Sequence, residues 1–148
     1  MENTYLTIEN IRHNSLFKYI SDRDLQNIIK LLKEENFPGN TLIFQENTRG
    51  ERVYFILEGR VKISKITKYG AETVLAVLSK GDFFGEMELL DDQPRSARTS
   101  TLDPTVVAMI TKQDFDSLIK TNHIVALNIL KAMSKRLRVA DGTIVNEL

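Results

Sequence analysis

Five short runs of β-branched and aromatic residues between positions 41 and 110 place the strongest constraint on the fold of this chain. Runs of this kind, when bounded by turn-forming residues, are typical of strands in a compact all-β barrel or roll. The bounding residues are Gly50, Gly59, Gly70, Gly81 and Pro104. The predicted strands are Thr41–Gln45, Val53–Leu57, Val61–Ile66, Thr73–Leu78 and Val106–Ile110. Because so short a link joins two of them at Gly59, residues 53–63 predict a hairpin-like pair that turns at this glycine.

Helical patterns flank the β-rich region on both sides. Ser21, with Asp24 three residues later, matches a helix N-terminus. An amphipathic helix should follow and stop before Pro38-Gly39, with an apolar face formed by Leu25, Ile28, Ile29 and Leu32. Beyond the last strand, residues 113–120 predict a short helix, and Thr121-Asn122 can cap a longer one that reaches about position 145.

The long C-terminal helix carries an apolar stripe that partly follows a seven-residue repeat. The stripe consists of Leu127, Leu130, Met133, Leu137, Ala140 and Ile144. In a monomer it could cover the β-rich region, and in a dimer it could pair with a second copy of the chain. Asp141-Gly142 interrupts the repeat, so the pattern alone favours dimerisation only modestly.

Composition excludes several functional classes. At 148 residues the chain suits one domain whose core needs no disulfide or metal. Its 20 basic and 20 acidic residues create no net field that would attract nucleic acid or an anionic membrane. The absence of cysteine excludes disulfides, thiolate nucleophiles and iron–sulfur clusters. Neither a signal peptide nor a membrane-spanning segment is predicted, which favours a soluble cytoplasmic protein.

No catalytic or metal-binding arrangement is visible. The two histidines, His13 and His123, lie far apart in the sequence and near no apparent nucleophile. Metal-ligand spacings and Walker-type phosphate loops are also missing. We therefore expect no catalytic residues, no metal, no cofactor and no enzymatic activity.

The stretch Gly81–Ala97 contains the residues with the most specific chemistry. Glu86 can accept hydrogen bonds from sugar hydroxyls, and Gly85 lets the backbone approach a ligand closely. Nine residues after Glu86, Arg95 offers a planar guanidinium matched to phosphate oxygens, and Ser96 adds a hydroxyl donor. This spacing suits a ligand with both a sugar diol and a phosphate. The alternative is a surface turn with an ordinary Glu–Arg ion pair.

This stretch resembles the phosphate-binding cassette of the cyclic nucleotide-binding domain. The domain is shared by catabolite-activator-type regulators, cyclic nucleotide-dependent kinases and cyclic nucleotide-gated channels. The matching residues are Gly85, Glu86, Leu89, Pro94, Arg95, Ser96 and Ala97. Residues 53–63 also resemble the second and third strands of the family's β-roll, so the resemblance spans roughly residues 15–140.

The resemblance implies an α+β, mostly β fold. We expect an eight-stranded β-roll, which is a jelly-roll-like double-stranded β-helix, with N-terminal helices, a short cassette helix and a long C-terminal helix. The whole chain, 1–148, should form a single cyclic nucleotide-binding domain. Within it we expect an N-terminal helical segment (1–40), the β-roll (41–112) with its cassette (81–97) and the C-terminal helices (113–148).

The resemblance also assigns roles in binding cAMP or cGMP. Arg95, Ser96 and the Ala97 amide are expected to hold the phosphate, and Glu86 and Gly85 the ribose. Leu75 corresponds to an apolar wall beside the ribose and base, and the alternative is a plain core role. Alignment of residues 135–139 with the family's long helix places the base-contacting pair at Ala140 and Asp141. Asp141 could accept a hydrogen bond from the base or be a solvated helix residue.

Glu88 departs from the family pattern, which has a small residue at this position. A second carboxylate close to an anion site is electrostatically unfavourable unless it points outward or pairs with Arg98. Exposure to solvent is the simpler expectation. The alternative is that Glu88 weakens nucleotide binding or holds Arg95 in the empty state.

Three functional hypotheses follow from the resemblance. The first is a cyclic nucleotide sensor that signals by moving its C-terminal helix, through which it contacts a second copy or a partner protein. The second is an interaction module that kept the β-roll and works without ligand. The third is the sensor fragment of a transcription regulator. Because the chain ends at Leu148 without a helix-turn-helix domain or net positive charge, we expect no specific binding to nucleic acid.

Overall fold

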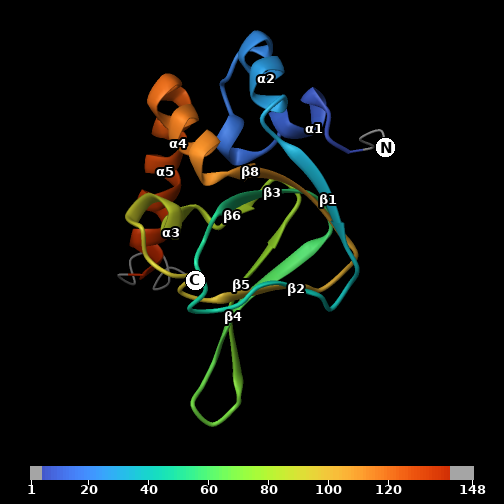
Figure 1. Ribbon diagram of the computed structural model, residues 1–148, viewed down its shortest axis with the longest axis vertical. Coiled ribbons are helices and arrows are strands. Elements are labelled where there is room, and N and C mark those ends of the chain that lie inside the picture. Colours follow the sequence, from blue (N-terminus) through green and yellow to red (C-terminus); the bar gives the residue numbers. More distant parts are fainter. Residues whose placement is uncertain (1–4, 141–148) are drawn as a thin grey trace.

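The computed structural model describes residues 5–140 and places the N-terminal helices at one end of a β-roll, with the long C-terminal helix along its side (Figure 1). The strands are β1 (Lys33–Phe37), β2 (Leu42–Phe44), β3 (Arg52–Glu58), β4 (Arg60–Ile66), β5 (Glu72–Ser79), β6 (Phe83–Phe84), β7 (Arg98–Thr101) and β8 (Thr105–Thr111). The helices are α1 (Ile8–Arg12), the 3₁₀ helix η1 (Ser15–Phe17), α2 (Asp22–Ile29), α3 (Glu86–Asp91), α4 (Lys112–Thr121) and α5 (His123–Ala140).

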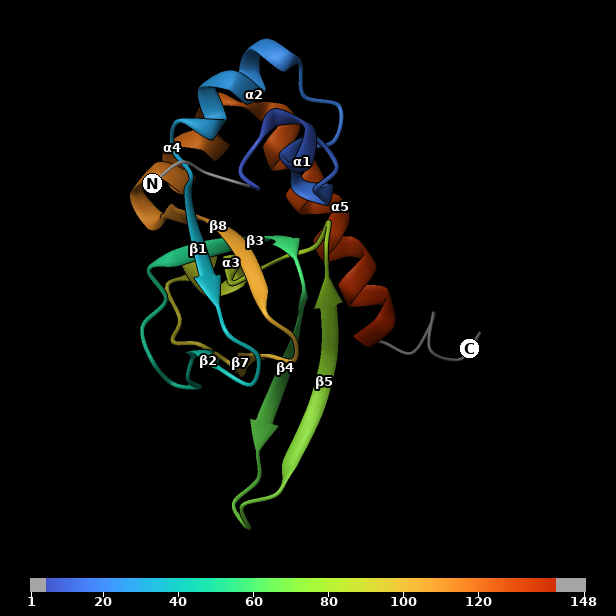
Figure 2. The same cartoon turned by 90° about the vertical axis from the view of Figure 1, so that its right-hand side faces the viewer.

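The eight strands form two antiparallel four-stranded sheets, in the orders β1-β8-β3-β6 and β2-β7-β4-β5. The β4–β5 hairpin extends from the end of the roll opposite the helices (Figure 2). This architecture confirms the predicted α+β, mostly β fold and its eight-stranded roll. Each of the five predicted strand runs coincides with a strand, and the predicted cassette helix is α3.

Strand β3 is buried on both faces, which explains its unbroken apolar sequence. Val53, Phe55 and Leu57 face the helices and belong to a core formed with α1, α2, α4 and α5. Tyr54 and Ile56 belong to a second core with side chains from both sheets, inside the roll. Because successive side chains of a strand point to opposite faces, β3 contributes to both the core beneath the helices and the core inside the roll.

Two predictions from the sequence are wrong, one on a boundary and one on a strand pairing. The N-terminal helical segment, expected over residues 1–40, gives way to a strand, because α2 ends at Ile29 and Lys33–Phe37 form β1. The polar sequence of β1 hides this strand, which is held by backbone pairing to β8. Residues 53–63 do not form a hairpin either, since β3 and β4 belong to different sheets. Gly59 instead makes the crossover with φ +94°, where an added Cβ would lie 2.5 Å from the Pro104 carbonyl oxygen.

The predicted starts of α2 and α5 are confirmed by their caps. The Ser21 hydroxyl accepts a hydrogen bond from the Asp24 amide at 3.2 Å. The Asn122 side chain accepts from the amides of Ile124 and Val125 at 3.1 and 3.2 Å. None of the helices within residues 5–140 is long and apolar enough to cross a membrane.

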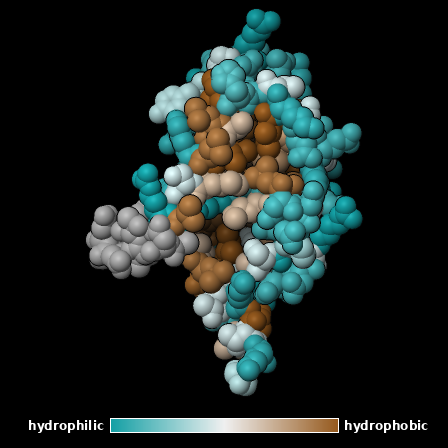
Figure 3. Space-filling model, turned by 90° about the vertical axis from the view of Figure 1, so that its left-hand side faces the viewer, coloured by the Kyte–Doolittle hydropathy of each residue, from teal (hydrophilic) through white to brown (hydrophobic). Residues whose placement is uncertain are grey.

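Three leucines of the apolar stripe of α5 do not cover the roll. Leu127, Leu130 and Leu137 are 48%, 63% and 68% exposed, whereas Val125 and Ile129 on another face of the helix are buried. Of the two alternatives for the stripe, packing on the β-roll is therefore excluded for these leucines. Apolar side chains accordingly gather on the surface of the side that carries α5 (Figure 3).

Candidate functional site

The cassette lies where β6 passes into α3 and where the following loop returns to β7. Gly85 precedes α3 with φ +90°, a left-handed conformation that costs other residues free energy. A Cβ at this position would lie 2.9 Å from Nη1 of Arg95. The glycine therefore serves both the turn and the close approach of the Arg95 side chain.

Arg95 is a buried cation, with only 2% of its surface exposed. Its Nη1 donates to the Gly85 carbonyl at 2.7 Å, and its Nη2 donates to the Arg52 carbonyl at 2.8 Å. Nη1 also contacts Glu88 Oε1 at 3.2 Å. Among the described residues, Nε has no hydrogen-bond partner although it is buried. The interpretation of Arg95 as part of a surface turn is therefore wrong.

An aromatic cluster supports the Arg95 guanidinium. Its carbon Cζ lies 4.0 Å from the centre of the Phe44 ring, within the range of a cation–π contact. Phe44 packs against Tyr54 and Phe84, whose rings stack with centroids 5.0 Å apart. Burial raises the pKa of the Tyr54 hydroxyl, and the nearby Arg95 charge opposes this shift. The guanidinium plane is thus fixed by apolar packing as well as by hydrogen bonds.

Glu88 points inward, contrary to the simpler expectation. Its side chain is 12% exposed, and its two oxygens divide between the predicted phosphate-binding side chains. Oε1 accepts from Arg95 at 3.2 Å and Oε2 from the Ser96 hydroxyl at 3.3 Å. The alternative in which Glu88 holds Arg95 is the arrangement that the structure contains.

Glu86 is bound to the long C-terminal helix. It is only 2% exposed, and its Oε1 accepts a hydrogen bond from Nη1 of Arg136 on α5. The Arg136 guanidinium also lies 5.4 Å from the centre of the Phe83 ring. Desolvation lowers the pKa of Arg136, and the charge of Asp82 works against this effect. One ion pair therefore connects the cassette to α5.

Sequence reasoning did not identify Arg136 or Phe44 as parts of this site. Arg136 lies three and four residues after Met133 and Ala132, which pack against the core. A cation on the inward face of a helix is a signal that an internal anion is present. Phe44 gave no such signal, because it appeared only as an ordinary strand residue.

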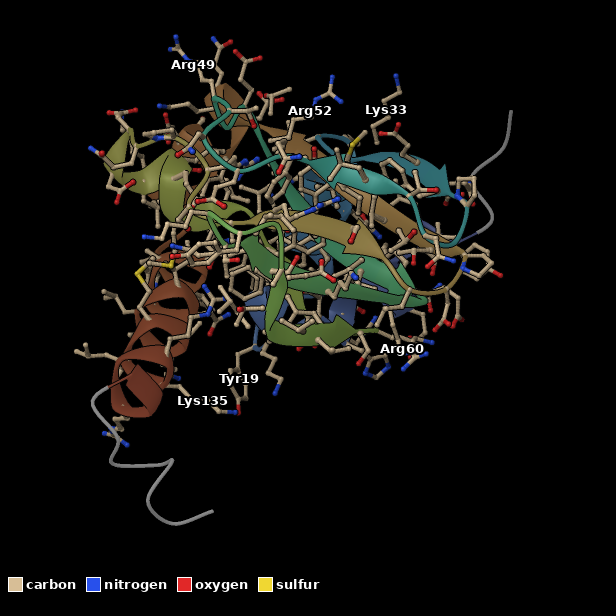
Figure 4. All side chains as sticks on the ribbon, turned by 90° about the horizontal axis from the view of Figure 1, so that it is seen from below. Tyr19, Lys33, Arg49, Arg52, Arg60 and Lys135 are labelled. Atoms are coloured by element: carbon tan, nitrogen blue, oxygen red, sulfur yellow. The ribbon has the colours of Figure 1, made fainter. Side chains whose placement is uncertain are left out.

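A cleft of about 940 Å³ lies between α5, η1 and the end of β5. Leu75 lines this cleft and is 53% exposed, so it is not a core residue. Arg136 lines it too and lies between the cleft and Glu86. Tyr19 and Lys135 line it as well (Figure 4).

The other predicted site residues have different outcomes. Ala97 is 7% exposed and directly precedes β7. Ala140 is the final residue of α5, and Asp141 lies outside the described residues. The structure thus brings Gly85, Glu86, Arg95, Ser96 and Ala97 together in one cassette. It leaves the proposed base contact at Ala140 and Asp141 as a prediction.

The fold is thus a β-roll of two four-stranded sheets, with a buried arginine and glutamate in its cassette and a C-terminal helix beside it. The family model described as the cyclic nucleotide-binding domain matches residues 34–122. The chain therefore belongs to the cyclic nucleotide-binding domain family.

Known proteins agree with this membership. The chain is 28% identical over 131 residues to the cyclic AMP receptor protein of Thermus thermophilus, covering 88% of this chain and 61% of that protein. It is 36% identical over 113 residues to the cAMP-dependent protein kinase regulatory subunit of Debaryomyces hansenii, covering 76% of this chain and 23% of that subunit.

A solved structure gives the same result. The Thermus thermophilus catabolite activator protein superimposes with a TM-score of 0.81 and 28% identity, over 88% of this chain and 62% of that chain. The chain thus spans less than two thirds of the length of these regulators.

Proposed function

We propose that this domain is a sensor of cAMP or cGMP that signals through α5. Arg95, Ser96 and the Ala97 amide would bind the phosphate, and Glu86 with Gly85 would bind the ribose. Leu75 would contact the base across the cleft, together with Ala140 and Asp141. The observation that carries the proposal is the buried Arg95, which is fixed by two carbonyls and an aromatic ring in a cassette of this family.

Burial of Arg95 supports a role in anion recognition. A charged group removed from water is retained only where compensating contacts stabilise it. Arg95 has such contacts, yet its Nε lacks a partner among the described atoms. A phosphate oxygen is the acceptor that a guanidinium fork matches best.

The contact between Arg136 and Glu86 supports the signalling part of the proposal. The ribose hydroxyls of a bound nucleotide would compete with Arg136 for the same carboxylate. Binding would thus weaken the connection between α5 and the cassette and shift the population of α5 positions. A ligand can shift this equilibrium only by its different affinities for the two states.

The exposed leucines of α5 support a contact with another protein chain. Leu127, Leu130 and Leu137 form an apolar surface beside the cleft that leads to Glu86. We propose that a second copy or a partner protein covers this surface and receives the signal. We further propose a regulatory, non-enzymatic, cytoplasmic role without direct contact to nucleic acid or membrane, as the balanced charge suggests.

Two alternative functions remain candidates. The bond between Glu88 and Arg95 favours an interaction module that works without ligand, since a protein carboxylate already contacts Nη1 of Arg95 and the Ser96 hydroxyl. The similarity to the Thermus thermophilus catabolite activator protein favours the sensor of a transcription regulator. Both alternatives use the same β-roll.

Isothermal titration of the nucleotide-free protein with cAMP and with cGMP tests the proposal. We expect saturable binding of one nucleotide per domain and an increase in melting temperature with ligand concentration. The absence of binding for both nucleotides at high micromolar concentration would exclude the sensor function and leave the ligand-independent module.

A further inference from the structure

The side chain of Glu88 contacts two of the three groups that the proposed function assigns to the phosphate, the Arg95 guanidinium and the Ser96 hydroxyl. One carboxylate oxygen contacts Arg95 at 3.2 Å, and the other accepts from the Ser96 hydroxyl at 3.3 Å. A phosphodiester likewise presents two anionic oxygens on one central atom. We propose that Glu88 is a built-in competitor for the ligand phosphate, which must be displaced before a cyclic nucleotide can bind; this inference rests on the proposed function.

Charge explains why the two anions exclude each other. Arg95 is 2% exposed, so solvent screens its surroundings weakly. It is the only cation in hydrogen-bond contact with Glu88 among the described residues. A phosphate placed beside a retained Glu88 carboxylate would put two negative charges against one guanidinium. One of the two anions therefore has to leave the contact.

Distances identify Glu88 as the group that moves. The bonds from Arg95 to the carbonyls of Gly85 and Arg52 measure 2.7 and 2.8 Å, shorter than its 3.2 Å contact with Glu88. The carbonyls belong to the backbone and hold the guanidinium in place, whereas Glu88 can rotate about its side-chain bonds. Its neighbours on α3, Met87 and Leu90, are exposed, so water lies close to the position it would take after displacement.

The unpartnered Nε of Arg95 is a second indication that the Glu88 carboxylate does not fully replace a ligand phosphate. Nε is buried and donates to no atom among the described residues. A donor of this kind carries a free-energy cost that a suitable ligand oxygen can remove. The Glu88 carboxylate, which reaches only Nη1, leaves that donor unsatisfied.

Competition of this kind sets the affinity of the site and hence the nucleotide concentration at which it responds. Removing the Glu88 charge should strengthen cyclic nucleotide binding by about tenfold to a hundredfold, the range of one charge-assisted hydrogen bond. The same change should lower the stability of the empty protein, because Arg95 loses its counter-charge.

The test is isothermal titration of cAMP and cGMP into nucleotide-free wild type, Glu88→Gln and Glu88→Ala. Asp91→Asn is the matched control, since it removes a carboxylate from the exposed end of the same helix without contact to Arg95. Melting temperatures with and without nucleotide are measured in parallel. We expect tighter binding, a lower melting temperature when empty and a larger ligand-induced increase in both Glu88 variants, with Asp91→Asn close to wild type.

The outcomes separate this inference from the proposed function. If the wild type binds nucleotide and the Glu88 variants bind equally or more weakly, the sensor function stands and the competitor is refuted. An equal gain in Asp91→Asn would also refute it, because general charge repulsion would then explain the effect. If neither the wild type nor any variant binds at high micromolar concentration, the sensor function itself fails, and the competitor with it.

Discussion

Replacement of Arg136 by alanine tests the connection between α5 and the cassette. Glu86 is 2% exposed, and removal of the partner from a buried ion pair costs about 3–5 kcal/mol. However, the Arg136 side chain is 42% exposed, so its truncation lets water reach Glu86. The cost of losing this ion pair is therefore below the range for a fully buried pair. With about 0.5 kcal/mol added for the lost contact with Phe83, we expect a loss of about 2 kcal/mol in the free energy of unfolding.

Urea denaturation and hydrogen exchange measure this effect. A loss of this size lowers the melting temperature of a domain of about 150 residues by about 4–8 °C. Amide exchange should accelerate in α5 residues 130–138 and change little in β3. Lys135→Ala is the control, since Lys135 lines the same cleft but forms no ion pair among the described residues. Equal stability and equal α5 exchange in Arg136→Ala and Lys135→Ala would refute the reasoning.

Three further predictions address the cassette, the crossover and acid stability. Arg95→Lys keeps the charge but loses the planar fork, and it should weaken cyclic nucleotide binding by about a hundredfold in a calorimetric titration; unchanged affinity would contradict the assignment. Gly59→Ala should lower the free energy of unfolding by about 3 kcal/mol or more in urea, because φ is +94° and the new Cβ would lie 2.5 Å from the Pro104 carbonyl oxygen. Gly70→Ala, with φ +83° and no atom within 4 Å, should cost only about 1 kcal/mol, and equal losses would rule out the steric explanation. Hydrogen bonds from Arg60 hold the pKa of Asp103 below its ordinary value, so this stabilisation exists above the unfolded-state pKa and is lost as the pH falls through the folded-state pKa. In Asp103→Asn the urea midpoint should therefore change less between about pH 5 and about pH 2 than in the wild type. The same pH profile in both proteins would contradict this role of Asp103.

The sequence pattern predicted five strands rich in β-branched and aromatic residues and missed β1 and β7, whose sequences are mostly polar. β3 is apolar because both of its faces are covered, so its sequence indicated a strand. β1 has the sequence Lys-Glu-Glu-Asn-Phe, and its pairing with β8 leaves no apolar signature. β7 buries Thr99 and Thr101, whose polar side chains also concealed the strand.

The cassette was predictable in its residues but not in its internal contacts. The glycine, glutamate and arginine spacing placed Gly85, Glu86 and Arg95 together. The direction of the Glu88 side chain depends on its rotamer and on the packing around Arg95, and the spacing of residues in the sequence determines neither. The partner of Glu86 lies 50 residues away on α5, and only the packed structure brings it there.

The crystal structure of the complex with cAMP or cGMP tests the central claim most directly. The account predicts that the phosphate contacts Arg95 and Ser96, that Glu88 has left both side chains, and that the ribose hydroxyls contact Glu86. A nucleotide bound elsewhere on the domain, with Glu88 still joined to Arg95, would contradict the account.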